Sequence, residues 1–317
     1  NTWTITFENV CVRLMAASGT NSAIDGTIKV GDSSIDKSAI VIAAKDSNVT
    51  LAGTATITAG KGGIGVYAEG AGKTVTVSNT SNITVGADGI YMYSKGATLN
   101  FTGNITADNQ IGIVAEGGTI TAGANSTITA NNGGIGSYVK GAAPSFGTTA
   151  ITVQSGIAGT DSDSAKYSMG IYYDSVASIG IIPTVTQTGS YTIGMVLNNS
   201  TGTTAGGISI GGSGSNQVGV MAKGNSNLTI AGNVSVAGDK NIGVYGENST
   251  ISVAGNISID SSISLTNSSI GVSLNGGSYT GTTGDISVGN NSIGIYGTNM
   301  TGGTISQSGA TMNVGNN

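Results

Sequence analysis

The side chains best suited to binding gather between positions 161 and 191. Four of the eleven tyrosines lie in this stretch, together with three aspartates. Aromatic faces accept the CH faces of a sugar ring, and carboxylates accept hydrogen bonds from its hydroxyls. We expect a ligand to contact this segment, with the candidate residues Tyr167, Tyr172, Tyr173, Tyr191, Asp161, Asp163 and Asp174.

Few residues of the chain can perform covalent or metal chemistry. The sequence has no histidine, which is the commonest general base and zinc ligand, and its single cysteine is Cys11. Asp161 and Asp163 form an isolated Asp-x-Asp pair, which is a weak calcium signal. We therefore expect no catalytic residue, no bound metal and no cofactor.

The charge balance also excludes classes of partner. Sixteen acidic residues against eleven basic ones give a net charge of −5, and Arg13 is the only arginine. Such a surface cannot neutralise phosphates, so we expect no nucleic-acid partner. The longest apolar run, residues 39–44, is far shorter than a membrane span needs, so we expect no membrane insertion by this segment.

The tyrosines belong to a motif that repeats along the chain: an apolar residue, glycine, a second apolar residue and often tyrosine. Ten copies are marked by Gly65, Gly89, Gly112, Gly136, Gly170, Gly194, Gly219, Gly243, Gly271 and Gly294. Seven of the nine intervals between these glycines measure 23 to 25 residues. A fixed period of this length is typical of a solenoid.

Each interval holds three short runs in which apolar residues alternate with hydroxyl residues, for example 218–222, 227–230 and 234–236. Isoleucine and valine supply these runs, whereas the chain has only seven leucines, too few for leucine-rich repeats. The pattern predicts an all-β, right-handed parallel β-helix with about 24 residues and three short strands per coil. Residues 1–317 would form one β-helical segment, with degraded coils in 1–40, regular coils in 41–317, and corner insertions near 154–168 and 260–269.

The alternation also assigns faces. The apolar residues that flank each marker glycine, such as Ile242 and Val244, are expected to point into the core, and Gly243 outward. In the third strand, Ser235 is expected to point outward. A turn ladder of amides in the left-handed conformation is expected at Asn82, Asn104, Asn233 and Asn256.

Two interpretations of the outward tyrosines stay open. The place two residues after the marker glycine holds tyrosine in six of ten copies: Tyr67, Tyr91, Tyr138, Tyr172, Tyr245 and Tyr296. Stacked aromatic rings can stabilise the solenoid, and they can equally form a recognition stripe. The corner insertion beside Tyr167 and Tyr172 favours recognition at that place.

The repeated Ile-Gly-Val-Tyr and Gly-Asn-Ile-Ser segments resemble the passenger regions of large type V autotransporter adhesins, particularly the long fusobacterial outer-membrane proteins. The resemblance covers Ile40 to Val314. It implies a monomeric passenger at the bacterial cell surface, tethered to the outer membrane through a C-terminal β-barrel not present in this sequence. It also implies host-cell receptors, host glycans or other bacteria as partners.

We therefore expect a cell-surface adhesin. The first alternative is a purely structural stalk that presents a binding head outside this segment. A weaker alternative is a polysaccharide-cleaving β-helix enzyme, which would need clustered carboxylates that the repeat positions lack.

Overall fold

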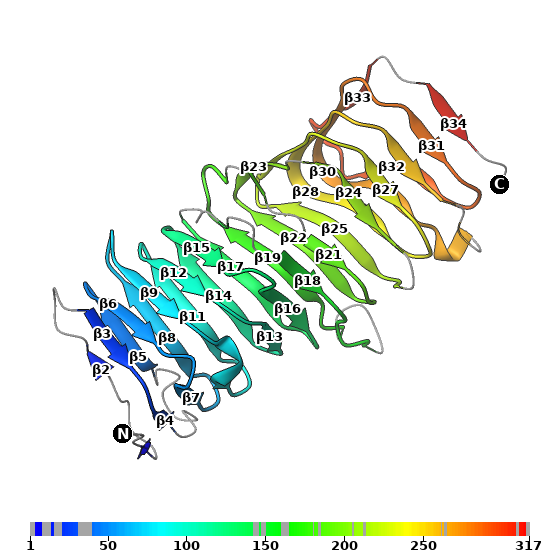
Figure 1. Ribbon diagram of the computed structural model, residues 1–317. Helices are drawn as coiled ribbons and strands as arrows, with labels where there is room; N and C mark the ends of the chain where they lie inside the picture. The colour runs from blue at the N-terminus through cyan, green and yellow to red at the C-terminus, as the bar shows by residue number, and fades with distance from the viewer. Residues whose placement is uncertain are drawn as a thin grey trace. The chain divides into compact units, whose positions relative to one another are not determined.

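The computed structural model is an all-β protein in which short strands stack in parallel into a β-solenoid (Figure 1). This confirms the fold class predicted from the repeat. The structure describes residues 4–7, 14–15, 21–30, 40–141, 146, 150–159, 165–179, 181–182, 185–204, 206–211, 214–260, 262, 265–308 and 311–314. Within these ranges the helical elements are two 3₁₀ turns, η1 (Thr80–Asn82) and η2 (Leu265–Asn267). The chain divides into two compact units, Asn1–Ile151 (unit 1) and Thr152–Asn317 (unit 2).

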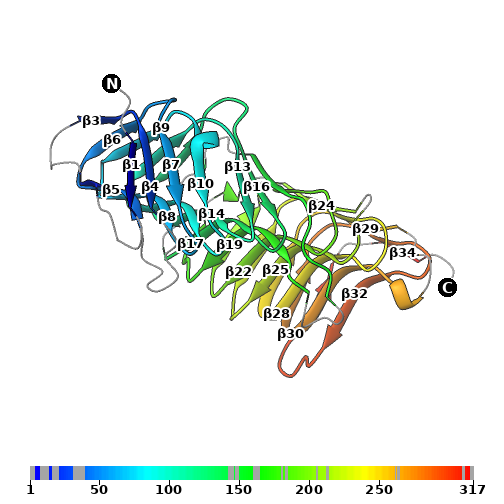
Figure 2. The same ribbon diagram turned by 90° about the horizontal axis from the view of Figure 1, so that it is seen from below.

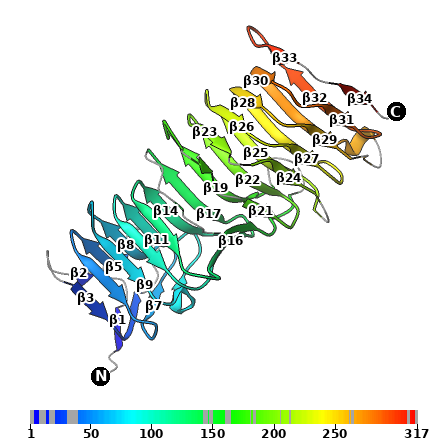
Figure 3. The same cartoon turned by 45° about the horizontal axis from the view of Figure 1, so that its top comes forward.

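In unit 1 each regular coil gives one strand to each of three parallel sheets (Figure 3). The front sheet contains β2 (Leu14–Met15), β5 (Ile40–Lys45), β8 (Ile64–Glu69), β11 (Ile90–Lys95), β14 (Ile111–Glu116) and β17 (Ile135–Lys140). The second contains β3 (Asn21–Ile24), β6 (Asn48–Leu51), β9 (Thr74–Val77), β12 (Thr98–Phe101) and β15 (Thr119–Ala122). The third contains β1 (Thr4–Phe7), β4 (Thr27–Val30), β7 (Thr56–Ala59) and β10 (Ile83–Val85), and then the pair β13 (Ile105–Asp108) and β16 (Thr127–Asn131).

Unit 2 repeats this three-sheet arrangement (Figure 2). Its front sheet contains β19 (Ser168–Asp174), β22 (Thr192–Asn198), β25 (Gln217–Lys223), β28 (Ile242–Val253), β30 (Ile270–Gly281) and β32 (Ile293–Thr298). The twelve-residue strands β28 and β30 continue round a corner into the second face, where they join β20 (Ile181–Ile182), β23 (Thr201–Thr204), β26 (Asn227–Ile230) and β33 (Ile305–Gln307). The third face contains β21 (Val185–Gln187), β24 (Ile208–Ile210), β27 (Val234–Val236), β29 (Ile257–Ile259), β31 (Ile286–Val288) and β34 (Met312–Val314), while β18 (Ala150–Val153) lies at the boundary of the units.

The strand register places like residues side by side along the solenoid. Val234 pairs with Ile257, which pairs with Ile286, and all three side chains are buried. Ser235 lies between buried Val234 and Val236 and is itself partly exposed, as the alternation predicted. Each coil thus buries its apolar side chains against the same side chains of its neighbours, so the repeat of the sequence becomes the repeat of the core.

The marker glycines form a column in which consecutive backbones approach closely. A Cβ added to Gly243 would lie 2.6 Å from the carbonyl oxygen of Gly271 and 2.5 Å from Cγ1 of Val234. At Gly112 the same atom would lie 2.5 Å from the carbonyl oxygen of Gly136. Real Cβ atoms do not come this close to a backbone oxygen, so the motif requires glycine for packing between coils.

This close approach changes the faces expected on the front strands. Gly243 and Val244 are both buried, whereas Ile242 and Tyr245 are both partly exposed. The two successive buried residues break the strict alternation, because the backbone at glycine itself packs against the core. The expectation that Ile242 points inward and Gly243 outward is therefore wrong, while Val244 faces inward as expected.

The repeat also has a different alignment in one coil. Ile90 pairs with Ile64, and Tyr93 pairs with Tyr67. Tyr91 therefore occupies the glycine place, and Gly89 lies outside the glycine column. The sequence motif at this coil was assigned two residues too early, because Gly89 resembles the marker in type but not in strand position.

The amide ladder at the corner before the third sheet is confirmed at Asn104, Asn233 and Asn256, whereas Asn82 donates its amide to the carbonyl of Gly53 at 2.7 Å. The side-chain oxygen of Asn233 accepts a hydrogen bond from the backbone N–H of Asn256 at 2.9 Å, and Asn256 accepts one from Asp285 at 2.9 Å. The sequence predicts the left-handed conformation at these asparagines, but their backbone does not adopt it. Left-handed residues such as Asn225 and Asn248 lie at the corner that follows the front sheet.

Replacement of Gly243 by alanine should destabilise the protein by about 1–3 kcal/mol, because the new methyl group would meet a carbonyl oxygen and a core side chain. Gly206 is the matched control, since a Cβ there has nothing within 4 Å. Gly206→Ala should change the free energy of unfolding by less than about 0.5 kcal/mol. Equal denaturation midpoints for the two variants in urea would contradict the role of the glycine column.

Replacement of Ser137 by alanine should raise the free energy of unfolding by about 1 kcal/mol. The Ser137 side chain is fully buried beside Ile113, and its hydroxyl has no hydrogen-bond partner. Removing the hydroxyl removes an unpaired polar group from the core. Ser235→Ala, at an outward position, should leave the melting temperature unchanged, and a lower melting temperature for Ser137→Ala would show that the hydroxyl is satisfied.

Candidate functional site

The front sheet of unit 2 carries an apolar patch on its outer face. Two columns of this sheet face outward. One contains the residue before each marker glycine, and the other contains the residue two places after it. Both columns are apolar from β19 to β28. We call this surface the tyrosine patch. Buried Ile193, Val196 and Val218 form its floor, and the partly buried side chains that pack on them are Tyr167, Met169, Tyr172, Met221, Ile242 and Tyr245.

Two of the predicted site tyrosines contact each other at one side of the patch. The rings of Tyr167 and Tyr191 lie 5.9 Å apart between centroids and are inclined at 65°, which is the favourable edge-to-face arrangement. Partial burial raises the pKa of Tyr167 above its ordinary value, and the nearby Tyr191 adds a smaller contribution in the same direction. The Tyr167 phenol is therefore a neutral hydrogen-bonding group on an aromatic surface at physiological pH.

Tyr172 lies in the second outward column and has a cation above its ring. The ammonium of Lys223 is 5.5 Å from the ring centroid, within the range of a cation–π contact. Val196 and Met221 occupy the same column in the next two coils. The column thus presents the Tyr172 ring and the Met221 thioether with the buried Val196 side chain between them.

A polar column borders the tyrosine patch at the carboxyl ends of its strands. Asp174, Asn198 and Lys223 lie in register in three consecutive coils. The amide of Asn198 donates a hydrogen bond to the Asp174 carboxylate at 3.0 Å, and the hydroxyl of Ser175 donates another at 3.2 Å. The predicted combination of aromatic rings beside carboxylate and amide groups is therefore present around Tyr172 and Asp174.

Tyr173 does not belong to this surface, so its assignment as a ligand-binding residue is wrong. Its side chain is only 1% exposed and packs inside the coil, and burial raises the pKa of its phenol. Adjacent residues of a strand point to opposite faces, so Tyr172 and Tyr173 cannot both be on the surface. The density of tyrosines in the sequence does not show which of the two side chains is buried and which is exposed.

The corner insertion begins and ends close to the tyrosine patch. Ile157 and Lys166 form an antiparallel bridge, with backbone hydrogen bonds of 2.8 and 2.9 Å between them. Ser168, which follows on β19, donates a hydrogen bond from its hydroxyl to the carbonyl of Ser155 at 2.5 Å. Asp161 and Asp163 lie outside the described residues, so their part in a site stays a prediction.

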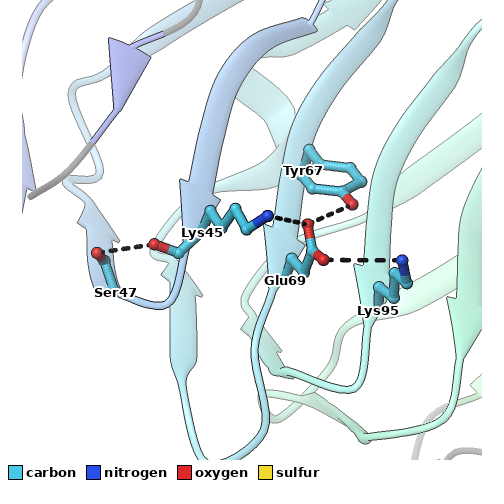
Figure 4. Close-up of polar contacts among 5 residues, drawn as sticks. All are labelled: Lys45, Ser47, Tyr67, Glu69 and Lys95. Atoms are coloured by element: carbon cyan, nitrogen blue, oxygen red, sulfur yellow. Dashed lines mark hydrogen bonds and ion pairs between the residues drawn. The ribbon is translucent and has the colours of Figure 1, made fainter. Parts of the chain in front are cut away.

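A second ordered set of polar side chains lies on the front sheet of unit 1 (Figure 4). The ammoniums of Lys45 and Lys95 lie 3.9 and 3.7 Å from the carboxylate oxygens of Glu69, which also accepts a 2.9 Å hydrogen bond from the hydroxyl of Tyr67. The Tyr67 hydrogen bond, together with the two ammoniums, lowers the pKa of Glu69. Glu69 therefore stays ionised at physiological pH.

The sequence did not single out several residues of these surfaces. Strict alternation through the glycine assigns Met169 and Ile242 to the core, whereas Met221 lies in the outward column that the alternation predicts. Lys223 is not among the predicted site residues, although it occupies the same strand-end place as Asp174. An alignment of the copies by the last residue of the front strand would have shown this polar column.

Groups that could hold a metal ion, meaning three or more histidine, cysteine, aspartate or glutamate side chains together, are not found in the described part of the chain. A search of the same residues finds no helix long and apolar enough to cross a membrane. The tyrosine patch and its border are thus a surface of aromatic, apolar and polar side chains.

Replacement of Tyr173 by alanine should cost about 3–5 kcal/mol of stability, because it empties a large buried volume. Tyr172→Ala removes a half-exposed ring one residue away, and we expect a loss of less than about 1 kcal/mol. Urea denaturation followed by circular dichroism compares the two variants. Similar losses would mean that the faces of β19 are assigned wrongly.

Comparison with protein-family models, with curated proteins and with solved structures gives no match.

Proposed function

We propose that this protein is a bacterial cell-surface adhesin and that unit 2 contacts the ligand through the tyrosine patch. The observation that carries the proposal is the outward cluster of Tyr167, Met169, Tyr172 and Met221 over a regular parallel sheet. A contiguous apolar face on a folded protein marks an interaction surface when polar groups border it. Here the border consists of Asp174, Asn198 and Lys223.

The chemistry of the patch fits a glycan or a glycosylated receptor. Tyrosine rings and methionine thioethers accept the apolar CH faces of pyranose rings, and the carboxylate of Asp174 and the amide of Asn198 can bind hydroxyls. The solenoid backbone holds these groups in place before binding, so little entropy is lost when a ligand docks. Other bacteria carry surface glycans of the same chemistry and are equally suitable partners.

We propose binding and not catalysis. Hydrolysis of a glycosidic bond needs two carboxyl groups on opposite sides of the bond. On the tyrosine patch, Asp174 is the one carboxylate in the three-coil polar border, and it is engaged by Asn198 and Ser175. Among the described strand-end residues of the patch, the other carboxylate is Glu247 on β28, three coils from Asp174. At about 4.8 Å per coil these two groups stand farther apart than the paired acids of a glycosidase.

The alternative is a structural stalk, and the regular register of unit 1 favours it for that part of the chain. Strands β5, β8, β11 and β14 pair in unbroken register through the last residue of each strand. Repetition of this kind suits a spacer. Unit 1 as spacer and unit 2 as contact surface are compatible roles within one adhesin.

Replacement of Tyr172 by alanine should weaken binding of the full chain to host cells or to a responding glycan by about 1–3 kcal/mol, because aromatic anchors dominate such contacts. Binding to a glycan array and to cultured cells measures the effect, with the melting temperature recorded for each variant. Tyr296→Ala is the matched control, since Tyr296 is 45% exposed in the same column of the front sheet but lies outside the patch.

An additional variant, Asp161→Asn with Asp163→Asn, tests the insertion separately. Loss of binding in this variant alone would move the contact from the sheet to the loop. Parent-like binding by Tyr172→Ala, or equal losses in Tyr172→Ala and Tyr296→Ala, would contradict the tyrosine patch and favour the stalk.

A further inference from the structure

The last residues of β5, β8, β11 and β14 form a column of alternating charge, which Lys140 at the end of β17 continues. Lys45 pairs in register with Glu69, Glu69 with Lys95, and Lys95 with Glu116. We call these four residues the charge ladder. The side chains of Lys45, Glu69 and Lys95 are 46, 25 and 53% exposed, so the charges remain accessible although neighbouring rungs pair with one another.

An apolar stripe runs beside the charge ladder on the same outer face. It contains the partly exposed residues Ile64, Ile90, Tyr67 and Tyr93, and the rings of the two tyrosines lie 5.3 Å apart. The Tyr93 hydroxyl donates to the Glu116 carboxylate at 2.6 Å, as Tyr67 does to Glu69. The two hydrogen bonds fix stripe and ladder as one surface, with apolar groups on one side and alternating charges on the other.

We propose that this surface is a homodimer interface, occupied by a second copy of the chain in antiparallel orientation. The argument is charge complementarity about a two-fold axis that runs along the strands, between β8 and β11. Rotation about this axis reverses the order of the coils but leaves each column facing itself. Lys45 then faces Glu116 of the partner subunit, and Glu69 faces Lys95 of the partner subunit.

The same operation also matches the apolar stripe. Tyr67 is placed opposite Tyr93 of the partner subunit, and Ile64 opposite Ile90 of the partner subunit. Four rungs of alternating sign give opposite charges at every rung, so the interface is isologous and closed at two subunits. In a parallel arrangement with the two charge ladders face to face and not shifted along the solenoid, each charge would instead face its own copy, which has the same sign.

The spacing of the charges selects a second solenoid over other partners. Neighbouring rungs are separated by the distance between paired strands, about 4.8 Å. Side chains on one face of an extended peptide recur at about 6.6 Å, so a single strand could match only one or two rungs. A polyanion such as a nucleic acid or sulfated glycan would meet a carboxylate at every second rung. This proposal is independent of the tyrosine patch, and it departs from the monomer that the sequence resemblance implied.

Sedimentation equilibrium of the full chain tests the proposal, with a reducing agent present so that Cys11 cannot form an intermolecular disulfide. Two variants keep the length of the ladder but remove its alternation. One carries Glu69→Lys with Glu116→Lys and has a wholly basic ladder, while the other carries Lys45→Glu with Lys95→Glu and has a wholly acidic one. We expect the parent to dimerise and each variant alone to dimerise at least about tenfold more weakly, because like charges then face each other.

An equimolar mixture of the two variants should regain dimers, since every rung then faces an opposite charge. Circular dichroism and melting temperatures establish that both variants are folded. A parent that stays monomeric at all concentrations, variants that dimerise as tightly as the parent, or folded variants whose mixture does not associate would each overturn the proposal. End-to-end association through open strand edges would be insensitive to these substitutions and would continue beyond the dimer.

Discussion

The close approach of consecutive coils at the glycine column is the constraint on which the other features depend. Six marker glycines lie under the backbone carbonyl of the next one, and a single methyl group would prevent this contact: Gly112, Gly170, Gly194, Gly219, Gly243 and Gly271. Because the backbones meet there, the front strands pair closely and in register, and the core side chains of the third sheet pack directly over the glycines. At Gly243, for example, Val234 and Val236 lie where a side chain would be. The glycine is therefore a packing requirement of the stack, and the repeat in the sequence follows from it.

The same contact decides which side chains the protein presents. Because the glycine and its successor are both buried, the residues on either side of this pair both face outward. An apolar residue and a tyrosine thus appear on the surface in some coils, as Ile242 and Tyr245 do. The outer face of a solenoid could have been polar throughout, yet here the front sheet exposes apolar columns beside a polar strand end. In unit 2 that end pairs Asp174 with Asn198, and in unit 1 it alternates lysine and glutamate.

Buried polar columns stabilise the coil corners behind these surfaces. In unit 2 the hydroxyl of Ser226 accepts from the backbone N–H of Ser200 at 3.0 Å, and that of Ser249 accepts from Ser226 at 3.1 Å. On the other side of the front strands, Asn241 accepts from the backbone of Gln217 at 2.9 Å and donates to Gly214 and Ala237. Each rung satisfies a backbone group that a turn would otherwise leave unpaired in the interior. The corners therefore stay ordered without leucine-rich packing, and the faces between them can carry binding groups on a stable frame.

The sequence by itself determined the fold class, the coil period, the inward residues such as Val244 and the amide ladder at Asn233 and Asn256. These features repeat in every coil and depend on local alternation and on pairing between equivalent residues, so a period is enough to predict them. Tyr167, Tyr172, Tyr191 and Asp174 were also placed correctly near one another, since they are neighbours along one or two coils. Only the tertiary structure decided that Tyr173 is buried, that Ile242 is exposed and that Tyr93 replaces Tyr91 in the outer column. The physical reason is that contact between backbones at glycine interrupts the alternation of faces, and only the packing of one coil on the next reveals where that contact falls.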